Sequence, residues 1–161
     1  MAKEAKTNAM RMLERAKVNY TAHEYPHEEG QAVDGANVAR LTGQDPARVF
    51  KTLVTQGADH NYYVFVVPVL AELDLKKAAK AAGVKSVAMI HVADINKVTG
   101  YIRGGCSPVG MKKQFPTVFH ATAADLPAIM VSAGRIGHQV QCDPQALLSL
   151  LGAKTADIIV D

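Results

Sequence analysis

Apolar and polar positions along the chain follow two periods, and each period predicts one kind of element. Apolar residues spaced three or four positions apart predict helices over residues 7–17, 34–41, 72–84, 93–98 and 143–152. Runs of β-branched and aromatic residues predict strands over residues 20–25, 48–55, 62–69, 116–120 and 156–160, with two more inside 128–142. Because strands and helices mix without a regular alternation, we predict an α+β fold with one mixed, curved β-sheet.

Capping residues support the two clearest helices. Asp74 can accept hydrogen bonds at the start of a helix that Gly83 ends, and Asp143 can do the same for the helix that Gly152 ends. Between the two strands of 128–142, the glycines at 134 and 137 predict the connecting turn.

Length and composition fit a globular protein with a buried core. No repeat or linker divides the 161 residues, so we predict a single compact domain over residues 1–161. The formal net charge of +3 permits a nucleic-acid or phosphate-bearing partner without requiring one. The longest apolar run, residues 62–71, is too short to cross a bilayer as a helix and predicts a buried strand stopped by Pro68. We therefore expect no membrane partner.

The usual catalytic signatures are absent from the sequence. Cys106 and Cys142 are far apart and outside any metal-binding pattern, which argues against a zinc site and a secreted disulfide scaffold. Two isolated cysteines and a charged N-terminus that lacks an apolar signal core together predict a cytoplasmic protein. The six histidines are not spaced as a metal pair, and the motifs of serine hydrolases, zinc peptidases and P-loops are missing.

Lys51 is the first candidate for chemistry. In the strand predicted over 48–55, alternation puts it on the same face as Val49 and Leu53. A lysine on an apolar face loses hydration, so its ammonium either reaches back to water or meets an anion. It is thus either an edge lysine or an ammonium at a pocket wall that binds a phosphate or carbonyl oxygen.

The glycine-rich segment GGCSP, Gly104 to Pro108, is the second candidate. Glycines allow close approach to the backbone, whose N–H groups could hold an anion or a polarised carbonyl oxygen. A turn without a ligand is the alternative. Cys106 has no histidine near it in sequence, which disfavours it as a nucleophile.

Two weaker features carry similar alternatives. The second glycine-rich turn, Ser132 to Gly137, fits either a hairpin connection or a pocket wall. Lys76, Lys77 and Lys80 on the helix predicted over 72–84 fit a solvated face or a contact with RNA phosphates.

Four blocks of the sequence resemble the YbaK/EbsC family, the free-standing relatives of the editing domain inserted in bacterial prolyl-tRNA synthetases. The likeness runs from about residue 13 to residue 158, with matching order and spacing of the blocks FKTLV, VVPVLAELDLKKAAKAAGVKSV, TGYIRGGCSPVGMKKQFPT and VSAGRIG. It implies that family's fold, a curved mixed sheet or partial barrel flanked by helices, and it implies no metal and no cofactor.

The resemblance also implies an activity, deacylation of Cys-tRNA(Pro) or Cys-tRNA(Cys) in trans. Prolyl-tRNA synthetase tends to mischarge cysteine, which is close to proline in volume, and one pocket separates such near-isosteres by only about 1–3 kcal/mol. In the family the substrate's own thiol is thought to attack its ester carbonyl, so the protein only folds the substrate and stabilises the oxyanion. The implied partners are the acceptor end of aminoacyl-tRNA and, as a candidate, prolyl-tRNA synthetase.

Residue roles follow from the matching motifs. The family's functional lysine matches Lys51 and its GxxxP loop matches residues 104–108, so the expected catalytic residues are Lys51, Gly104, Gly105 and Ser107. The expected substrate-binding residues are Tyr25, Thr52, Cys106, Pro108, Ser132, Gly134 and Gln139. Gln139 stands where some relatives have an acidic residue, and because it brings no charge the preference for cysteine over alanine stays open.

Two other functions stay open at this point. One is a non-catalytic module that binds an aminoacyl or nucleotide end in the same pocket, and the other is a small-molecule hydrolase that uses Cys106. Lys51 together with the complete GxxxP loop favours the deacylase.

Overall fold

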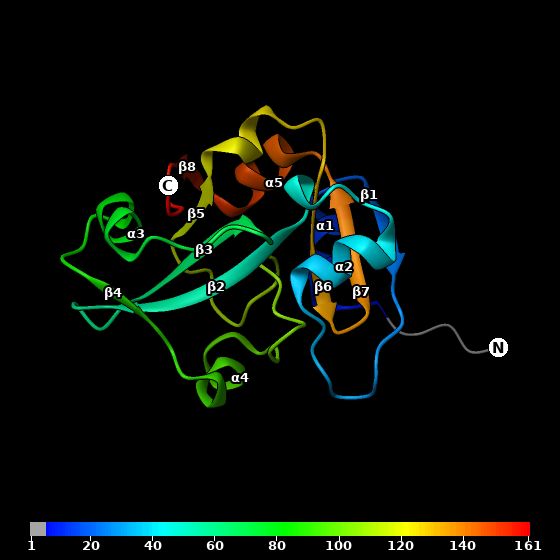
Figure 1. Ribbon diagram of the computed structural model, residues 1–161, viewed down its shortest axis with the longest axis horizontal. Helices are drawn as coiled ribbons and strands as arrows, with labels where there is room; N and C mark the ends of the chain where they lie inside the picture. Colours follow the sequence, from blue (N-terminus) through cyan, green and yellow to red (C-terminus); the bar gives the residue numbers. More distant parts are fainter. Residues whose placement is uncertain (1–5) are drawn as a thin grey trace.

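Two β-sheets and five α-helices make up the computed structural model, which describes residues 6–161 (Figure 1). Residues 1–5, at the start of the expected domain, lie outside the described residues. The helices are α1 (Asn8–Arg15), α2 (Gly35–Thr42), α3 (Leu75–Ala82), α4 (Ile95–Thr99) and α5 (Pro144–Leu151). The strands are β1 (Tyr20–Glu24), β2 (Phe50–Gly57), β3 (Tyr62–Pro68), β4 (Val87–Met89), β5 (Thr117–His120), β6 (Ile129–Arg135), β7 (His138–Cys142) and β8 (Lys154–Ala156).

The strands form one antiparallel and one mixed sheet. The three-stranded sheet has the order β1-β7-β6, and the five-stranded sheet has the order β4-β2-β3-β5-β8, in which β5 runs parallel to both of its neighbours. The predicted α+β class is therefore confirmed. The strands that we expected in one curved sheet lie in two sheets. Among the described residues, Val49, which directly precedes β2, forms an isolated parallel bridge with Met130 of β6, and the hydrogen-bond ladder does not continue from one sheet to the other.

Capping explains why the helices begin and end where they do. The Asp34 carboxylate accepts from the Asn37 amide at the start of α2, and the Asp74 carboxylate accepts from the Lys76 and Lys77 amides at the start of α3. Helices α2, α3 and α5 each end at a glycine in the left-handed conformation, as expected for a C-terminal cap.

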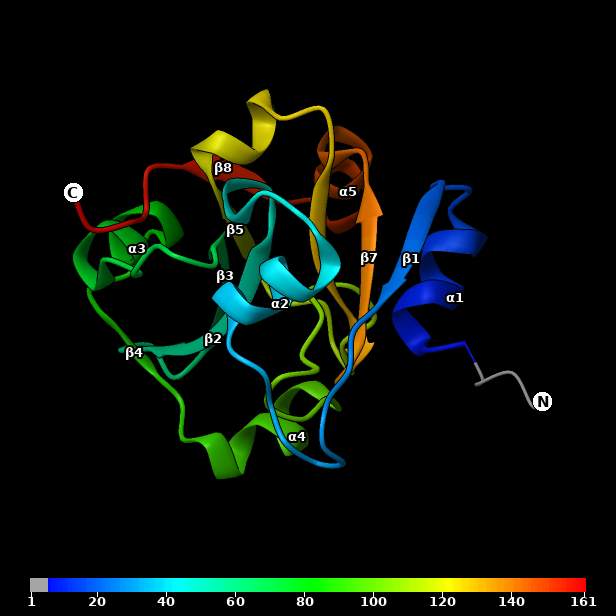
Figure 2. The ribbon, with the colours of Figure 1, turned by 45° about the vertical axis from the view of Figure 1, so that its right-hand side comes forward.

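The buried core has a part beside each sheet. Helix α1 packs along the three-stranded sheet through Ala9, Met10 and Leu13, while α3 covers the five-stranded sheet with Ala78 and Ala79 (Figures 1 and 2). A smaller cluster between α2 and the start of β2 contains Tyr25, Val38, Ala39, Val49 and Met130. This smaller cluster lies where the two sheets meet, next to the cavity described below.

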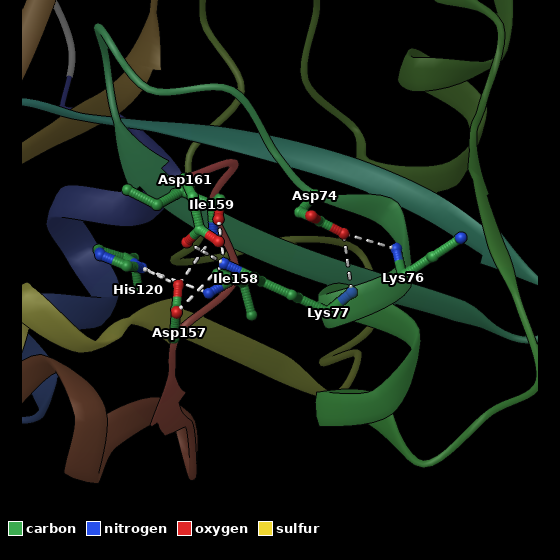
Figure 3. Close-up of polar contacts among 8 residues, drawn as sticks. All are labelled: Asp74, Lys76, Lys77, His120, Asp157, Ile158, Ile159 and Asp161. Atoms are coloured by element: carbon green, nitrogen blue, oxygen red, sulfur yellow. Dashed lines mark hydrogen bonds and ion pairs between the residues drawn. The ribbon is translucent and has the colours of Figure 1, made fainter.

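Lys77 of α3 fastens the C-terminal segment to the five-stranded sheet (Figure 3). Its ammonium lies 3.2 Å from Asp157 Oδ2 and 2.7 Å from Asp161 Oδ1, and it donates to the Ile159 carbonyl at 2.8 Å. The strand predicted over 156–160 is displaced to Lys154–Ala156, because Ile159 makes only an isolated bridge with Leu73. Within residues 6–161, none of the helices has the length and apolar character needed to cross a membrane.

Candidate active site

A cavity of about 130 Å³ opens where the start of α2, the start of β2, the glycine-rich loop and the three-stranded sheet come together. Its polar lining comes from Lys51, Thr52, Cys106, Ser132 and Gln139, with backbone from Gly35 and Gly104. The remaining wall is apolar and consists of Val33, Val38, Val49, Phe50 and Val69. Six residues singled out from the sequence, far apart along the chain, thus share one small hollow: Lys51, Thr52, Gly104, Cys106, Ser132 and Gln139.

Lys51 is half-buried at the wall of this cavity. Burial lowers the pKa of its ammonium, and the charge of Glu72 opposes that shift. Among the described residues the Lys51 ammonium has no hydrogen bond and no ion pair within 4 Å. A partly desolvated cation without a hydrogen bond or close ion pair is stabilised when an anionic or polar ligand enters the hollow.

The loop from Gly100 to Gly110 contributes Gly104 and Cys106 to the lining of the cavity. Gly104 has φ +85°, and a Cβ there would lie 2.6 Å from the Ala32 Cβ, so both conformation and space require glycine. The amides of Gly104 and Cys106 donate to no acceptor within residues 6–161. Because both residues also line the cavity, their amides are candidate donors to a carbonyl oxygen.

Gly105 does not share that role. Its amide donates to the Ile102 carbonyl at 2.9 Å, so the expectation that it grips the substrate carbonyl is corrected. A Cβ on Gly105 would lie 3.0 Å from the Ile136 nitrogen, and the residue serves to pack the loop against the β6–β7 turn. Ser107 is fully buried and its hydroxyl accepts from the Val109 amide, while Pro108 is buried and does not line the cavity.

Three buried polar atoms near the cavity lack a hydrogen-bond partner among the described residues. They are Thr52 Oγ1, Gln139 Oε1 and Tyr25 Oη. Thr52 and Gln139 line the hollow itself, and Tyr25 belongs to the cluster that forms its apolar wall. Buried polar groups are nearly always paired, so this grouping indicates a polar ligand.

Ser132 and Gln139 face each other across the β6–β7 hairpin. The register of the pairing shifts between Ser132 and Arg135, and the Ser132 hydroxyl accepts from the Gly134 amide at 3.1 Å within that bulge. Gly134 has φ +99° and does not line the cavity; a Cβ there would lie 2.8 Å from the Tyr101 ring. Its role is to shape the hairpin beside the site.

Cys106 is poorly suited to act as a nucleophile. Burial raises the pKa of its thiol to about 11, because the thiolate would be desolvated. At pH 7 that value leaves on the order of one thiol in ten thousand ionised. Its sulfur lies 4.0 Å from the Thr99 hydroxyl, and we therefore treat it as a wall of the hollow.

Comparison with known proteins identifies the family of this chain. The model of the aminoacyl-tRNA editing domain matches residues 28–150. The chain belongs to the aminoacyl-tRNA editing domain family. A protein of Enterococcus faecalis (strain ATCC 700802 / V583), provisionally named Cys-tRNA(Pro)/Cys-tRNA(Cys) deacylase EbsC, is 50% identical over 153 residues, which cover 95% of this chain and 93% of the relative.

Solved structures share the fold of this editing domain. A crystal structure described as a provisional trans-editing enzyme for prolyl tRNA synthetase has a TM-score of 0.81 at 24% identity, covering 98% of this chain and 100% of that one. A hypothetical protein designated APE2540 has a TM-score of 0.85 at 19% identity, covering 96% and 100%. These structures support the fold, and the family model and the Enterococcus faecalis relative confirm the resemblance seen in the sequence blocks.

The sequence patterns missed two features in or beside the candidate site. The first is the N-terminal turn of α2, where Gly35 packs so closely that a Cβ would lie 2.4 Å from the Val69 Cβ. The second is Tyr101, whose buried hydroxyl donates to the Val109 carbonyl at 2.7 Å and ties the loop across its ends. An aspartate–glycine pair before a helix and a tyrosine inside a glycine-rich loop were the available signals.

Proposed function

We propose that this protein is a trans-editing deacylase that removes cysteine from mischarged tRNA, with Cys-tRNA(Pro) as its main substrate. Membership of the aminoacyl-tRNA editing family and 50% identity to a relative named for this activity support the proposal. The structural observation that carries it is the meeting of the unpaired Lys51 ammonium and the free amides of Gly104 and Cys106 around one hollow.

The chemistry needs little from the protein. The substrate's thiol sulfur attacks its own ester carbonyl carbon and forms a C–S bond, while the ester C–O bond breaks. The thiol proton goes to the departing ribose oxygen, so the products are a cyclic thiolactone and the free 3′ end of the tRNA. Negative charge develops on the carbonyl oxygen, and the amides of Gly104 and Cys106 donate to it. A small hollow that folds the aminoacyl group favours the attack by proximity.

The other lining residues have roles that suit their chemistry. Lys51 anchors the terminal adenosine or a phosphate next to it. Gln139 Oε1, which accepts hydrogen bonds and has no protein donor among the described residues, receives the substrate's α-ammonium. The hydroxyl of Thr52 completes the set as a donor or acceptor at the same wall.

The proposed setting is the cytoplasm, with the protein acting as one domain. The formal net charge of +3 is low for gripping a whole tRNA, so recognition centres on the acceptor end. A prolyl-tRNA synthetase that presents this end is the proposed protein partner.

Deacylation of one tRNA(Pro) carrying different amino acids tests the proposal. The wild-type protein is incubated with tRNA(Pro) charged with cysteine, serine, alanine or proline, and release of each amino acid is followed. We expect cysteine to be released about 100-fold faster than serine, since a hydroxyl of nearly the same size is a much weaker nucleophile than a thiol.

Two results would contradict this proposal. Equal rates on cysteine and alanine would remove the substrate thiol from the mechanism. Binding of charged tRNA with no release of any amino acid would favour the non-catalytic binding module.

A further inference from the structure

A second hollow, which we call the basic groove, lies at the far end of the β2–β3 hairpin from the candidate active site. It has a volume of about 550 Å³ and is formed by residues 60–63, by Lys97 and Val98 of α4, and by residues 112–116. None of these residues lines the cavity that holds Lys51.

The charge of the basic groove is positive. Lys97, Lys112 and Lys113 line it, and its described lining contains no aspartate or glutamate. Lys97 pairs with Asp94 at 3.3 Å, and the Lys112 ammonium donates to the Lys97 carbonyl at 3.4 Å. Within residues 6–161 the exposed Lys113 ammonium has no ion pair and no hydrogen bond. At least one full positive charge is therefore free to meet a phosphate.

Aromatic rings lie beside these lysines. Tyr62 and Phe115 pack edge to face with their centroids 5.6 Å apart, and both line the basic groove. Phe115 is buried in the core, whereas Tyr62 is partly exposed, so Tyr62 is the ring that a base can reach. Lysines beside an accessible aromatic ring suit a single nucleic-acid strand, since phosphates meet the lysines and a base stacks on the ring.

The position of the basic groove fits a strand that ends in the active site. Lys51 and Gln56 are five residues apart on β2, and Gln56 pairs with Tyr62 of the groove. Five residues of β-strand span about 17 Å. The segment from Gly100 to Pro116 also contributes to both hollows, with Gly104 at one and Lys113 at the other.

We propose that the basic groove binds the 3′ strand of the tRNA acceptor end while the aminoacyl ester occupies the Lys51 cavity. At a rise of about 3.4 Å per stacked nucleotide, 17 Å corresponds to about five nucleotides, which brings the unpaired 3′ end and the first pairs of the acceptor stem over the groove. This inference rests on the proposed function, because it takes the aminoacyl end as the occupant of the cavity.

The test compares two double variants that remove the same charge. K112Q/K113Q removes two lysines of the basic groove and keeps their aliphatic stems, and K76Q/K80Q removes two exposed lysines of α3 as a matched control. Binding of an uncharged RNA hairpin that copies the acceptor stem and its 3′ end is measured by fluorescence anisotropy over a range of salt concentrations. We expect K112Q/K113Q to weaken binding about tenfold at low salt and to make the log–log salt slope shallower by about 1 to 2. We expect K76Q/K80Q to match the wild type.

The possible outcomes distinguish failure of the groove proposal from failure of the proposed deacylase function. Equal binding by wild type and K112Q/K113Q, or an equal loss in both double variants, would overturn the groove proposal even if the wild type releases cysteine normally. The binding assay needs no turnover, so a wild type that binds the hairpin through Lys112 and Lys113 but releases no cysteine would defeat the proposed function and leave the groove. Circular dichroism of both variants checks that the fold is intact.

Discussion

Lys51 shows how a single side chain can be set apart by its surroundings. It sits on a strand with valine, phenylalanine and leucine neighbours, and burial lowers the pKa of its ammonium. Most surface lysines reach water or pair closely with an acidic side chain, whereas Lys51 lies at a cavity wall and feels the charge of Glu72 without pairing with it. An ammonium in that position contributes little to holding the fold together and can contribute strongly to holding a ligand.

We expect Lys51→Ala to abolish deacylation and to leave the fold intact. Because Lys51 anchors the terminal adenosine or its phosphate in the proposed function, its loss misplaces the ester and lowers kcat/KM by about 100-fold or more. Single-turnover release of cysteine from Cys-tRNA(Pro) measures the effect, and thermal unfolding measures stability. Lys51→Arg is the matched control for charge, and Lys76→Ala is the control for loss of an exposed lysine. Wild-type turnover by Lys51→Ala would remove this lysine from the mechanism.

The glycine-rich loop is the element that adds backbone amides to the lining of the candidate site. Its left-handed glycine at 104 lets the chain pass against Ala32, and the Gly105 amide closes a turn onto Ile102. The hydroxyl of Tyr101 then spans the loop to the carbonyl of Val109, and its burial raises the pKa of this phenol to about 12. The loop is thus held from inside, while among the described residues the amides of Gly104 and Cys106 stay free of protein acceptors.

Tyr101→Phe tests this internal support. The buried Val109 carbonyl would lose its donor, and we expect the free energy of unfolding to fall by about 1–2 kcal/mol. The catalytic rate should fall as well, because the amides of Gly104 and Cys106 would be held less firmly. Urea unfolding and cysteine release measure the two effects.

Tyr20→Phe serves as the control for that variant. It removes a tyrosine hydroxyl that donates to Glu14 at 3.0 Å between β1 and α1, away from the cavity. If both variants changed activity to the same extent, the idea that Tyr101 positions the loop would fail.

Across the whole molecule, the C-terminal segment is locked to the five-stranded sheet by ionisable groups. His120, at the end of β5, is buried, and its Nδ1 accepts from the Ile158 amide at 3.4 Å (Figure 3). Burial lowers the pKa of His120, with Asp157 acting in the opposite direction and Lys77 in the same one. The His120 imidazole is therefore neutral in this arrangement, since a protonated Nδ1 could not accept the hydrogen bond from the Ile158 amide.

This lock predicts a pH dependence of stability. Because the folded-state pKa of His120 lies below its unfolded value of about 6.5, the neutral ring contributes fully above pH 6.5, and its contribution is lost as the pH falls below that value. We expect the free energy of unfolding of the wild type to decrease between pH 7.5 and pH 5.5, and that of His120→Asn to change much less. Urea unfolding at several pH values measures both. Parallel curves for the two proteins would show that His120 does not cause the dependence.

Local patterns in the sequence predicted the five α-helices, most of the strands and the family, but they missed the short strand β4. Asp74 and Gly83 cap the two ends of α3 through hydrogen bonds to residues a few positions away. The runs rich in β-branched and aromatic residues form β2, β3, β5, β6 and β7, because such side chains fit a pleated, buried surface. The family blocks also named Lys51 and Gly104, which do share a cavity. The β6–β7 hairpin was predicted from its glycine turn and is confirmed. The pairing of strands distant in sequence was not predicted, and one expected sheet proved to be two, since such pairing depends on partners far apart in the chain.

The contents of the site likewise depended on long-range packing. No local sequence signal predicts that the Gly105 amide donates a hydrogen bond within the protein while the Gly104 amide does not. The difference arises from how the loop folds on Ile102 and Ala32. The unpaired oxygens of Thr52 and Gln139 come from different sheets and become neighbours of one hollow only when those sheets meet. Residue types and caps act within a few positions of the chain, whereas desolvation and cavities exist only between segments that folding brings together.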